Sequence, residues 1–409
     1  MKLVFWSVAI QAVGSAATLA AALLVASTLG LAAQGQFGLL RSWNDALVTI
    51  AVLGLPQGLL HLQYRESVPV TALQPWVLRY VGVVAVACAL LGAVAVAAVP
   101  AGALPSATIV ALAVAVPLAA AHLLWRALAL REVGVLSYAA ITAAPSLLML
   151  AALVPLALFA GTPGLVWALL VGALLSATLS GWIVHRALRL RTNARPVPTW
   201  SRATLWSVGA ETGMQSVLTA LSPALVLSTV RWLGASLTEV GVISLGLHVY
   251  QLFGVAAAYV GPMVYDRAAS AVRPPVVADI TAWLRPRVTL TRIALAVITA
   301  VMALVLAHWL QPISAASLVM LALMALAGSL SLAVRVLATL MLARGAFRPL
   351  TLQALVRLCI TMFGAALLLR QVGAVLAVPL VLVATELLLL VWLLRLLHRD
   401  GVVQSSKPV

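Results

Sequence analysis

The stretch AVLAVPLVLVATELLLLVWLL, residues 374–394, contains a single charged residue, Glu386. A helix needs about 20 apolar residues to cross the hydrocarbon core of a bilayer. Such a segment must be helical, because lipid offers no hydrogen-bond partner to an open backbone amide. Runs of the same kind recur along the whole chain. The sequence therefore predicts an all-α polytopic membrane protein with about 12 transmembrane helices.

The composition agrees with this fold class. Of the 409 residues, 64% are apolar and only 8% are charged, with a mean hydropathy of +1.15. A soluble domain carries about 25% charged residues, so a single soluble domain is excluded. A net charge of +16 would suggest nucleic acid in a soluble protein. Here the arginines lie between apolar runs, so the charge indicates topology and anionic lipid, and no nucleic-acid partner is expected.

The predicted spans are residues 3–28, 42–62, 76–99, 106–125, 135–159, 164–185, 205–231, 241–263, 289–309, 315–342, 350–370 and 374–394. Twenty of the 25 Lys and Arg residues fall at the termini or in the even-numbered connections. The odd-numbered connections hold only Arg41, Arg231 and Arg370. Basic residues concentrate on the cytoplasmic side of membrane proteins. Both termini are therefore expected in the cytoplasm, at the inner membrane of a bacterium.

A basic, proline-containing stretch divides the chain into two sets of six spans. We expect an N-terminal bundle over residues 1–190, a linker over 191–203, a C-terminal bundle over 204–398 and a cytoplasmic tail over 399–409. Six spans per half give both bundles the same orientation, which predicts a pseudo-two-fold axis along the membrane normal.

The first span of each half carries a polar stripe, with steps of three and four residues that place it on one helical face. The stripes are Gln11, Ser15 and Thr18 in the first half, and Glu211, Gln215, Thr219 and Ser222 in the second.

Short glycine-containing stretches recur around these spans. They are Leu29-Gly30 to Phe37-Gly38-Leu39-Leu40-Arg41-Ser42, Leu53-Gly54-Leu55-Pro56-Gln57-Gly58, Leu233-Gly234 to Val240-Gly241 with Pro262-Met263, and Ala343-Arg344-Gly345 to Gly373-Ala374. On these stretches and the six-plus-six layout, the sequence resembles the polysaccharide-biosynthesis membrane proteins. These are the O-antigen or lipid-linked oligosaccharide flippases of the multidrug/oligosaccharidyl-lipid/polysaccharide exporter (MOP) superfamily.

This resemblance implies a fold like that of the multidrug and toxic-compound (MATE) exporters. It also implies a flippase that moves an undecaprenyl-diphosphate-linked oligosaccharide from the inner to the outer leaflet by alternating access. Such a protein makes no bond, so we expect no enzymatic activity, no cofactor and no metal site. A polyprenyl-diphosphate-linked glycan, a coupling proton or sodium ion and a polysaccharide polymerase are the partners that the resemblance implies.

Two arginines inside spans are the main candidates for binding the substrate. A charge in the middle of a span costs about 2.5–3.5 kcal/mol on insertion scales, so each needs a compensating role. Arg335 and Arg357 could line a wet cleft and hold the diphosphate in a guanidinium fork. Alternatively, Arg357 forms a structural ion pair with Glu386 while Arg335 reaches toward the membrane surface. Gln11, Gln215 and Arg41 complete the expected substrate-binding set.

Three carboxylates are candidates for ion coupling: Glu211, Glu386 and Asp45. Glu211 could instead contact sugar hydroxyls or form an interhelical hydrogen bond. Asp45 is expected within one turn of an outer span end, as part of a solvated helix start.

Two other functions are compatible with parts of the sequence. A cation-coupled multidrug exporter of the same superfamily would also have twelve spans, but would favour carboxylates over arginines in its cavity. A membrane-embedded polysaccharide ligase or glycosyltransferase would need charged residues on a large outer loop, and the outer connections here are short and almost uncharged.

Overall fold

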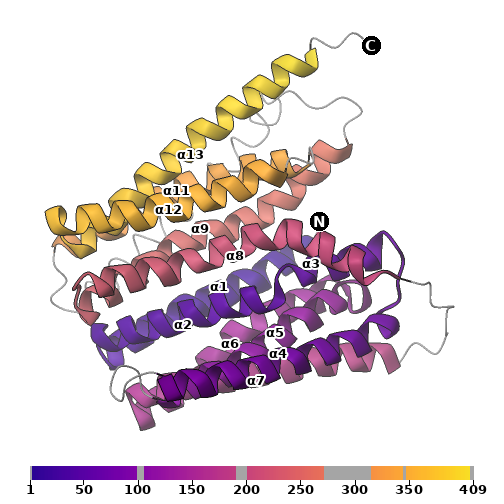
Figure 1. Ribbon diagram of the computed structural model, residues 1–409, viewed down its shortest axis with the longest axis horizontal. Coiled ribbons are helices and arrows are strands. Elements are labelled where there is room, and N and C mark those ends of the chain that lie inside the picture. Colours follow the sequence, from indigo (N-terminus) through magenta and orange to yellow (C-terminus); the bar gives the residue numbers. More distant parts are fainter. Residues whose placement is uncertain (1, 99–105, 190–199, 271–314, 344–346, 406–409) are drawn as a thin grey trace. The chain divides into compact units, whose positions relative to one another are not determined.

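The computed structural model describes residues 2–98, 106–189, 200–270, 315–343 and 347–405. Within these residues the chain is all-helical (Figure 1). Its helices are α1 (Lys2–Thr28), α2 (Leu31–Val52), α3 (Leu55–Tyr64), α4 (Val70–Ala98), α5 (Ser106–Glu132), α6 (Gly134–Ala160), α7 (Thr162–Arg189), α8 (Arg202–Trp232), α9 (Leu237–Ser270), α11 (Ala315–Ala343), α12 (Phe347–Val372) and α13 (Ala374–Ser405).

Most of these helices are long enough to cross a membrane. By length and composition, nine helices in the described ranges qualify, or ten if the bent pair of α2 and α3 is one span. The prediction of an all-α polytopic membrane protein is confirmed. The predicted span at 289–309 lies outside the described residues, and α13 continues to Ser405, into the segment predicted as a tail.

The chain forms two compact units. Unit 1 comprises residues 1–29 and 37–224, and unit 2 comprises residues 30–36 and 225–409. This division differs from the two predicted halves in two places. The start of α2 belongs to unit 2, and the first part of α8 belongs to unit 1. Both differences result from close glycine contacts described below.

In unit 1, small residues let the helix backbones approach closely. Helix α1 packs on α6, where a Cβ on Gly14 would lie 2.9 Å from the Cβ of Ala143. Helix α6 packs on α7, where a Cβ on Gly172 would lie 3.0 Å from the Cα of Met149. Small residues are typical of helix interfaces in membranes, because lipid tails supply no hydrophobic drive for association.

The first part of α8 lies against the break between α2 and α3. The bend between these two helices is 45° at Leu53 and Gly54, both of which have positive φ. A Cβ on Gly213 would lie 2.7 Å from the carbonyl carbon of Leu53, and one on Gly209 would lie 3.3 Å from the Gly54 oxygen. This backbone contact explains why residues 202–224 belong to unit 1.

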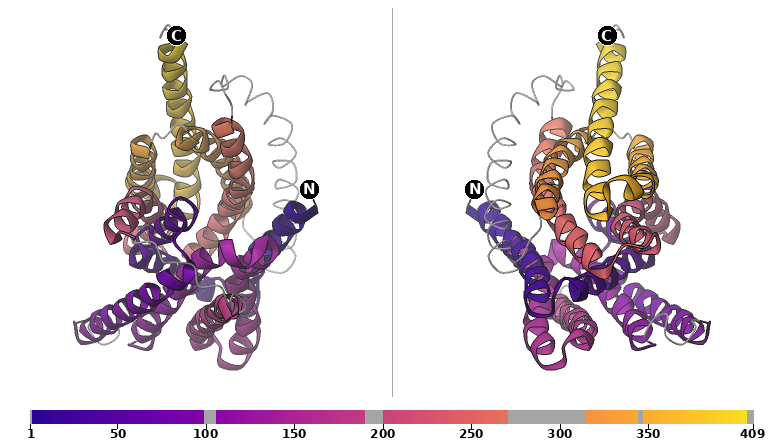
Figure 2. Two further views of the ribbon diagram at one scale, coloured as in Figure 1. Left: turned by 90° about the vertical axis from the view of Figure 1, so that its right-hand side faces the viewer. Right: turned by 90° about the vertical axis from the view of Figure 1, so that its left-hand side faces the viewer.

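Unit 2 is built around α9, α11, α12 and α13, which pack against one another (Figure 2). Its core includes Phe253 of α9, Leu332 of α11 and Leu389 of α13, all fully buried or nearly so. The Phe253 ring lies against Gly328 of α11, where a Cβ would meet the ring atoms. These contacts bring the polar residues of four helices into one place.

Helices α1 and α8 end in the same way. Gly30 has φ of 87° and Gly234 has φ of 102°, a left-handed conformation that glycine adopts without the clash of a Cβ. After Gly234, Ser236 and Glu239 form a capping box, because each side chain accepts a hydrogen bond from the backbone N–H of the other. The similar Leu-Gly stretches of the sequence therefore have similar helix-ending roles.

The predicted start of the second span was wrong. Helix α2 begins at Leu31 and runs through Gly35 and Gly38, so Arg41 is inside a helix and not in a connection. Asp45 lies 14 residues from the helix start, not within one turn of it. The physical reason is that Gly35 does not form a turn: it lets α2 cross the backbone of α9.

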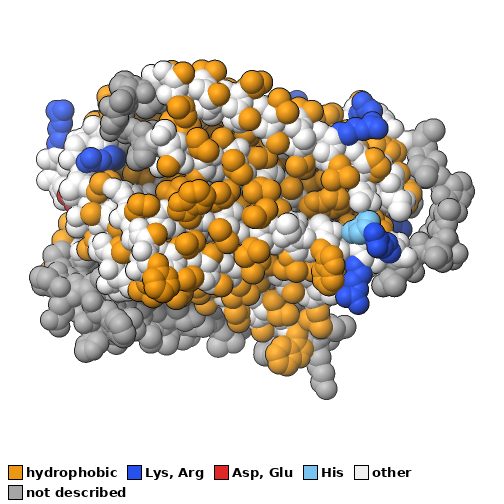
Figure 3. All heavy atoms as spheres, turned by 90° about the horizontal axis from the view of Figure 1, so that it is seen from below, with side chains coloured by type: hydrophobic (Ala, Val, Ile, Leu, Met, Phe, Trp, Pro, Cys, Tyr) orange, Lys and Arg blue, Asp and Glu red, His pale blue; other side chains and the backbone are white. Residues whose placement is uncertain are grey.

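The outer surface of unit 1 has the character of a lipid-facing surface. On α4, Val83 and Leu91 are 65% and 70% exposed. In the face shown in Figure 3, hydrophobic side chains cover the broad middle, and the Lys and Arg side chains gather toward its two ends. Apolar surface flanked by basic ends is expected where a protein contacts lipid tails between two headgroup layers.

Candidate functional site

The buried polar centre of unit 2 is an ion pair between α12 and α13. The guanidinium of Arg357 contacts both carboxylate oxygens of Glu386, with Nε 2.8 Å from Oε1 and Nη2 3.0 Å from Oε2. Arg357 is 7% exposed and Glu386 is fully buried. This two-point geometry suits a guanidinium and a carboxylate, and it satisfies two charges that would be costly to bury singly.

A third residue completes this cluster from α9. The Tyr250 hydroxyl donates a hydrogen bond of 2.5 Å to Oε1 of Glu386. Tyr250 is itself buried. Glu386 therefore accepts two hydrogen bonds, one from Arg357 Nη2 and one from Tyr250, and its Oε1 is also in ion-pair contact with Arg357 Nε. These contacts place both carboxylate oxygens of Glu386 against donors from two other helices.

Arg335 lies beside this cluster and has a different environment. It is half-buried on α11, and its Nε donates a hydrogen bond of 3.3 Å to the buried Ser331 hydroxyl. Its guanidinium lies against α9, where a Cβ on Gly254 would be 3.2 Å from the Arg335 Cζ. Among the described residues, no carboxylate forms an ion pair with Arg335. The guanidinium thus keeps its charge uncompensated within this part of the chain.

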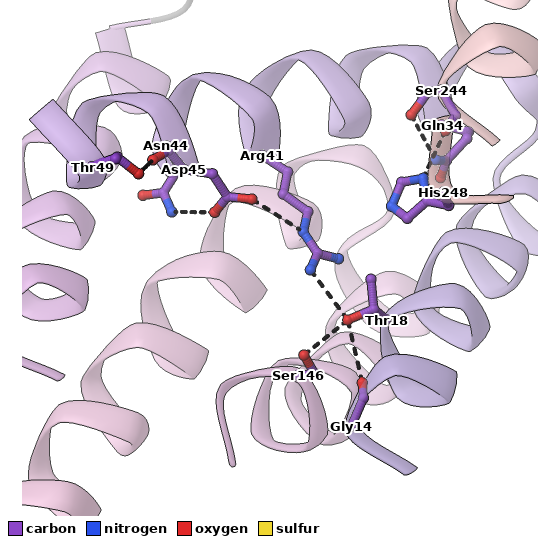
Figure 4. Close-up of polar contacts among 10 residues, drawn as sticks. All are labelled: Gly14, Thr18, Gln34, Arg41, Asn44, Asp45, Thr49, Ser146, Ser244 and His248. Atoms are coloured by element: carbon purple, nitrogen blue, oxygen red, sulfur yellow. Dashed lines mark hydrogen bonds and ion pairs between the residues drawn. The ribbon is translucent and has the colours of Figure 1, made fainter. Parts of the chain in front are cut away.

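A second polar cluster lies in unit 1 and joins α1, α2 and α6 (Figure 4). Thr18 donates a hydrogen bond of 2.8 Å to the Ser146 hydroxyl, and Arg41 donates one of 3.3 Å to the Thr18 oxygen. Arg41 is 4.0 Å from the Asp45 carboxylate, at the limit of an ion pair. The Arg41 side chain is 18% exposed and that of Asp45 is 62% exposed. One nitrogen of Arg41, Nη1, is buried and has no hydrogen-bond partner in the part of the chain that the structure describes.

A smaller polar contact joins the start of α2 to α9 within unit 2 (Figure 4). The Gln34 amide donates a hydrogen bond of 3.4 Å to the buried Ser244 hydroxyl. His248 Nδ1 lies 2.7 Å from the Ser244 carbonyl oxygen. Sequence patterns gave no indication of this contact, because it joins residues 210 positions apart.

The other predicted residues lie on α1 and α8. Gln11 is half-buried on α1, one helical turn before Ser15, whose hydroxyl donates to the Gln11 carbonyl. Gln215 is half-buried on α8, and its carbonyl accepts a hydrogen bond from Thr219. Glu211 is on α8 as predicted, but its side chain lies outside the described residues.

The structure therefore brings together some of the predicted residues and adds new ones. Arg335, Arg357 and Glu386 belong to one cluster, in which Tyr250, Ser331 and Gly254 were not predicted as contributors. Arg41 and Asp45 belong to another, with Thr18 and Ser146. The i, i+4 spacing of Ser331 and Arg335 on one helix was a usable signal for their contact. No described group of three or more His, Cys, Asp and Glu side chains is arranged to hold a metal ion.

Comparison with known proteins links the chain to one group of membrane proteins through structure alone. No protein-family model matches the sequence, and no curated protein matches it either. Solved structures match over nearly the whole chain. An inward-facing multidrug resistance MATE transporter of the MOP superfamily matches with a TM-score of 0.72 at 11% identity, covering 99% of this chain and 100% of that one.

Two further structures have the same architecture. A mutant of the Vibrio cholerae MATE transporter VcmN matches with a TM-score of 0.63 at 14% identity, covering 97% of each chain. A MOP superfamily transporter from Pyrococcus furiosus matches with a TM-score of 0.53 at 11% identity, covering 97% of this chain and 94% of that one. Identities this low establish the fold and nothing finer. The chain has the fold of the MATE transporters of the MOP superfamily.

Proposed function

We propose that this protein is an alternating-access transporter that moves a lipid-linked, diphosphate-bearing oligosaccharide from the inner to the outer leaflet. The single observation that carries this proposal is the Arg335 guanidinium, which has no ion-pair partner among the described residues. Arg335 lies eight residues, or about two helical turns, from the end of α11. A cation at that depth is costly, so an arginine without a partner there is a candidate for a functional role.

An uncompensated guanidinium suits a phosphate-bearing substrate. Moving isolated charges into hydrocarbon costs tens of kcal/mol by the idealised Born estimate. A barrier of this size prevents the charged headgroup from crossing the bilayer unassisted. A guanidinium lowers this barrier because it stays charged and binds phosphate oxygens through paired donors. Arg41 of unit 1 is a further candidate donor, since its Nη1 has no hydrogen-bond partner among the described residues. The lipid tail would remain in the bilayer while the headgroup crosses.

Features of the related structures support a transport cycle. Matching MATE transporters have been solved in inward-facing and outward-facing conformations. The Pyrococcus furiosus transporter is described as having a binding pocket of reverse polarity that suggests a different function. Arginines in place of carboxylates would be such a reversal in the chain described here. In this proposal Gln11 and Gln215 bind the glycan, and Glu211 or Asp45 carries a coupling proton or sodium ion.

The proposal includes the membrane, the lipid and the partner protein with which this chain would act. The distribution of basic residues supports a cytoplasmic location of both termini, at the inner membrane of a bacterium. Anionic lipid would contact the arginine-rich cytoplasmic connections. A polysaccharide polymerase on the outer side would consume the flipped glycan.

A multidrug exporter is the second candidate, and one observation favours it. The Asp45 side chain is 62% exposed in the interior of α2, only weakly paired with Arg41. An exposed carboxylate at membrane depth could bind a cationic drug or a coupling cation. The two candidates therefore differ in whether Arg335 or Asp45 contacts the substrate.

The test is expression of the chain in a bacterium that lacks its own oligosaccharide flippase, with surface glycan and drug tolerance both measured. The wild-type chain should restore surface glycan, Arg335→Gln should not, and Arg370→Gln at the exposed end of α12 should behave as the wild type. The wild-type chain should leave drug tolerance unchanged. Raised drug tolerance without surface glycan, lost in Asp45→Asn, would establish the exporter instead.

A further inference from the structure

We infer that Arg357 and Tyr250 act on the transported anion only through Glu386: they hold its carboxylate and so keep Arg335 uncompensated. This inference rests on the proposed function, because it assigns separate roles to the two arginines expected to bind the substrate. It makes Arg335 the substrate-binding cation of unit 2 and Arg357 a positioning residue.

The contacts of Glu386 engage both of its carboxylate oxygens. Oε1 accepts from Tyr250 at 2.5 Å and contacts Arg357 Nε at 2.8 Å, while Oε2 accepts from Arg357 Nη2 at 3.0 Å. The carboxylate is fully buried. The charges of Arg357 and Glu386 cancel, so the pair adds no net charge to the cluster.

The same contacts make Arg357 a poor ligand for a second anion. It is only 7% exposed, its Nη2 donates to the Glu386 carboxylate, and its Nε lies 2.8 Å from the same carboxylate. A phosphate could reach these nitrogens only by displacing Glu386, which would leave a carboxylate buried and unpaired. Removing one partner of a buried ion pair is strongly unfavourable for this reason.

Arg335 is placed where a released Glu386 carboxylate would attract it. Its guanidinium lies against Gly254, and Tyr250, which contacts Glu386, is one turn earlier on the same helix. Helix α11 packs on both α9 and α13, which carry these two residues. An opposite charge within about 4–6 Å forms a favourable pair in a poorly solvated site. Without Arg357 and Tyr250, Glu386 would therefore neutralise Arg335.

Two further residues hold Arg335 in place. Ser331 is 1% exposed, and its hydroxyl accepts the hydrogen bond from Arg335 Nε. Gly254 supplies the space for the guanidinium, because a Cβ there would lie 3.3 Å from Nη2. With Nε bound to Ser331, the two terminal nitrogens have no recorded bond to the described residues and are the donors that would face a phosphate. This orientation is the one that a paired contact with phosphate oxygens needs.

The first experiment compares single and double variants in the surface-glycan assay. Arg357→Met should lose surface glycan, because Glu386 is freed to pair with Arg335. Arg357→Met combined with Glu386→Gln should regain it, because the competing carboxylate is gone and the Gln oxygen still accepts from Tyr250. If Arg357 itself bound the substrate, the double variant would remain as inactive as the single one. Arg370→Met, an exposed arginine on the same helix, should have no effect.

The second experiment tests the charge at position 335 without any substrate. Arg335→Cys is introduced with Cys88→Ala and Cys359→Ala, and its reaction rates with a cationic and an anionic thiosulfonate are compared. Adding Arg357→Met should raise the cationic-to-anionic rate ratio several-fold, and adding Glu386→Gln as well should reverse the increase. An unchanged ratio would overturn the inference. So would a thiol that reacts with neither reagent, because a cation that binds a transported anion must be accessible to water.

These two readouts separate the possible failures. If the rate ratio changes as expected but no variant or wild-type chain displays glycan, the proposed function fails and the charge arrangement stands. If the wild type displays glycan but the double variant does not regain it, the role assigned to Arg357 fails alone. Protein amount in the membrane is measured for each variant. Tyr250→Phe, which keeps the ion pair, is the second variant if Arg357→Met does not insert. A smaller loss of surface glycan is expected, and full surface glycan would overturn the role assigned to Tyr250.

Discussion

Gly35 of α2 and Gly241 of α9 face each other at a helix crossing that leaves no space for a Cβ on either residue. A Cβ on Gly35 would fall on the Leu237 carbonyl and lie 3.0 Å from the Gly241 nitrogen. A Cβ on Gly241 would fall on the Leu31 carbonyl and lie 3.1 Å from the Gly35 nitrogen. The two halves of the contact are equivalent, because Leu31 lies four residues before Gly35 and Leu237 lies four residues before Gly241. This reciprocal contact assigns the start of α2 to unit 2.

Replacing Gly241 with Leu should therefore separate the two helices. The added side chain meets the backbone of α2, which cannot move aside as a flexible side chain can. Overpacking of this kind costs about 1–3 kcal/mol. Thermal unfolding of the purified protein in detergent should show a lower midpoint for Gly241→Leu. Gly82→Leu is the control, because a Cβ on Gly82 of α4 meets nothing within 4 Å, and it should unfold near the wild-type temperature.

Thr18 should contribute to stability through its two side-chain partners. Thr18→Val keeps the shape of the residue but removes the hydroxyl that binds Ser146 and Arg41. A hydrogen bond to a charged group that is lost inside a protein costs about 1.5–3 kcal/mol, and interhelical bonds in membranes average about 0.6 kcal/mol. We expect a loss of about 1 kcal/mol in the free energy of unfolding. Thr178→Val on α7 should cost less, because that exposed hydroxyl bonds only to its own helix.

The sequence was sufficient to predict α13 and most other helices, because membrane spans follow from local composition. The ion pair of Arg357 and Glu386 was one of two alternatives for these residues, and it is present in the structure. A charged residue inside a span needs a partner of opposite charge, and the spans contain few such residues. Tyr250 was not predicted as their third partner, because it lies 136 positions from Glu386 and its hydroxyl carries no charge.

The start of α2 could not be predicted from local pattern. The stretch Gly35-Gln36-Phe37-Gly38 has the composition of a turn, since glycine usually lowers helix stability. In the structure Gly35 is helical because it permits the crossing with α9, a contact between segments about 200 residues apart. The predicted positions of Arg41 and Asp45 relative to the helix start were wrong for the same reason. Tertiary packing decides such cases, and a single sequence does not reveal it.

The orientation of the chain is a further prediction. Basic residues concentrate at the termini and in the even-numbered connections, so the C-terminus should be cytoplasmic. A green fluorescent protein fused after residue 409 should fluoresce, since it folds in the cytoplasm. Alkaline phosphatase fused at the same place should be inactive. Active phosphatase and a dark fluorescent fusion would reverse the predicted orientation.

The most direct test of the central claim measures transport by the purified protein in vesicles that contain a fluorescent glycan on a polyprenyl diphosphate. Movement between leaflets is followed with a quencher that does not cross the membrane. The wild-type chain should move the lipid. Arg335→Lys should retain part of the transport rate, because lysine keeps the charge but not the paired donors. Arg335→Gln should reduce the rate at least about tenfold, the equivalent of about 1.4 kcal/mol. Equal rates for Arg335→Gln and the wild type would contradict the claim that this guanidinium carries the anion across.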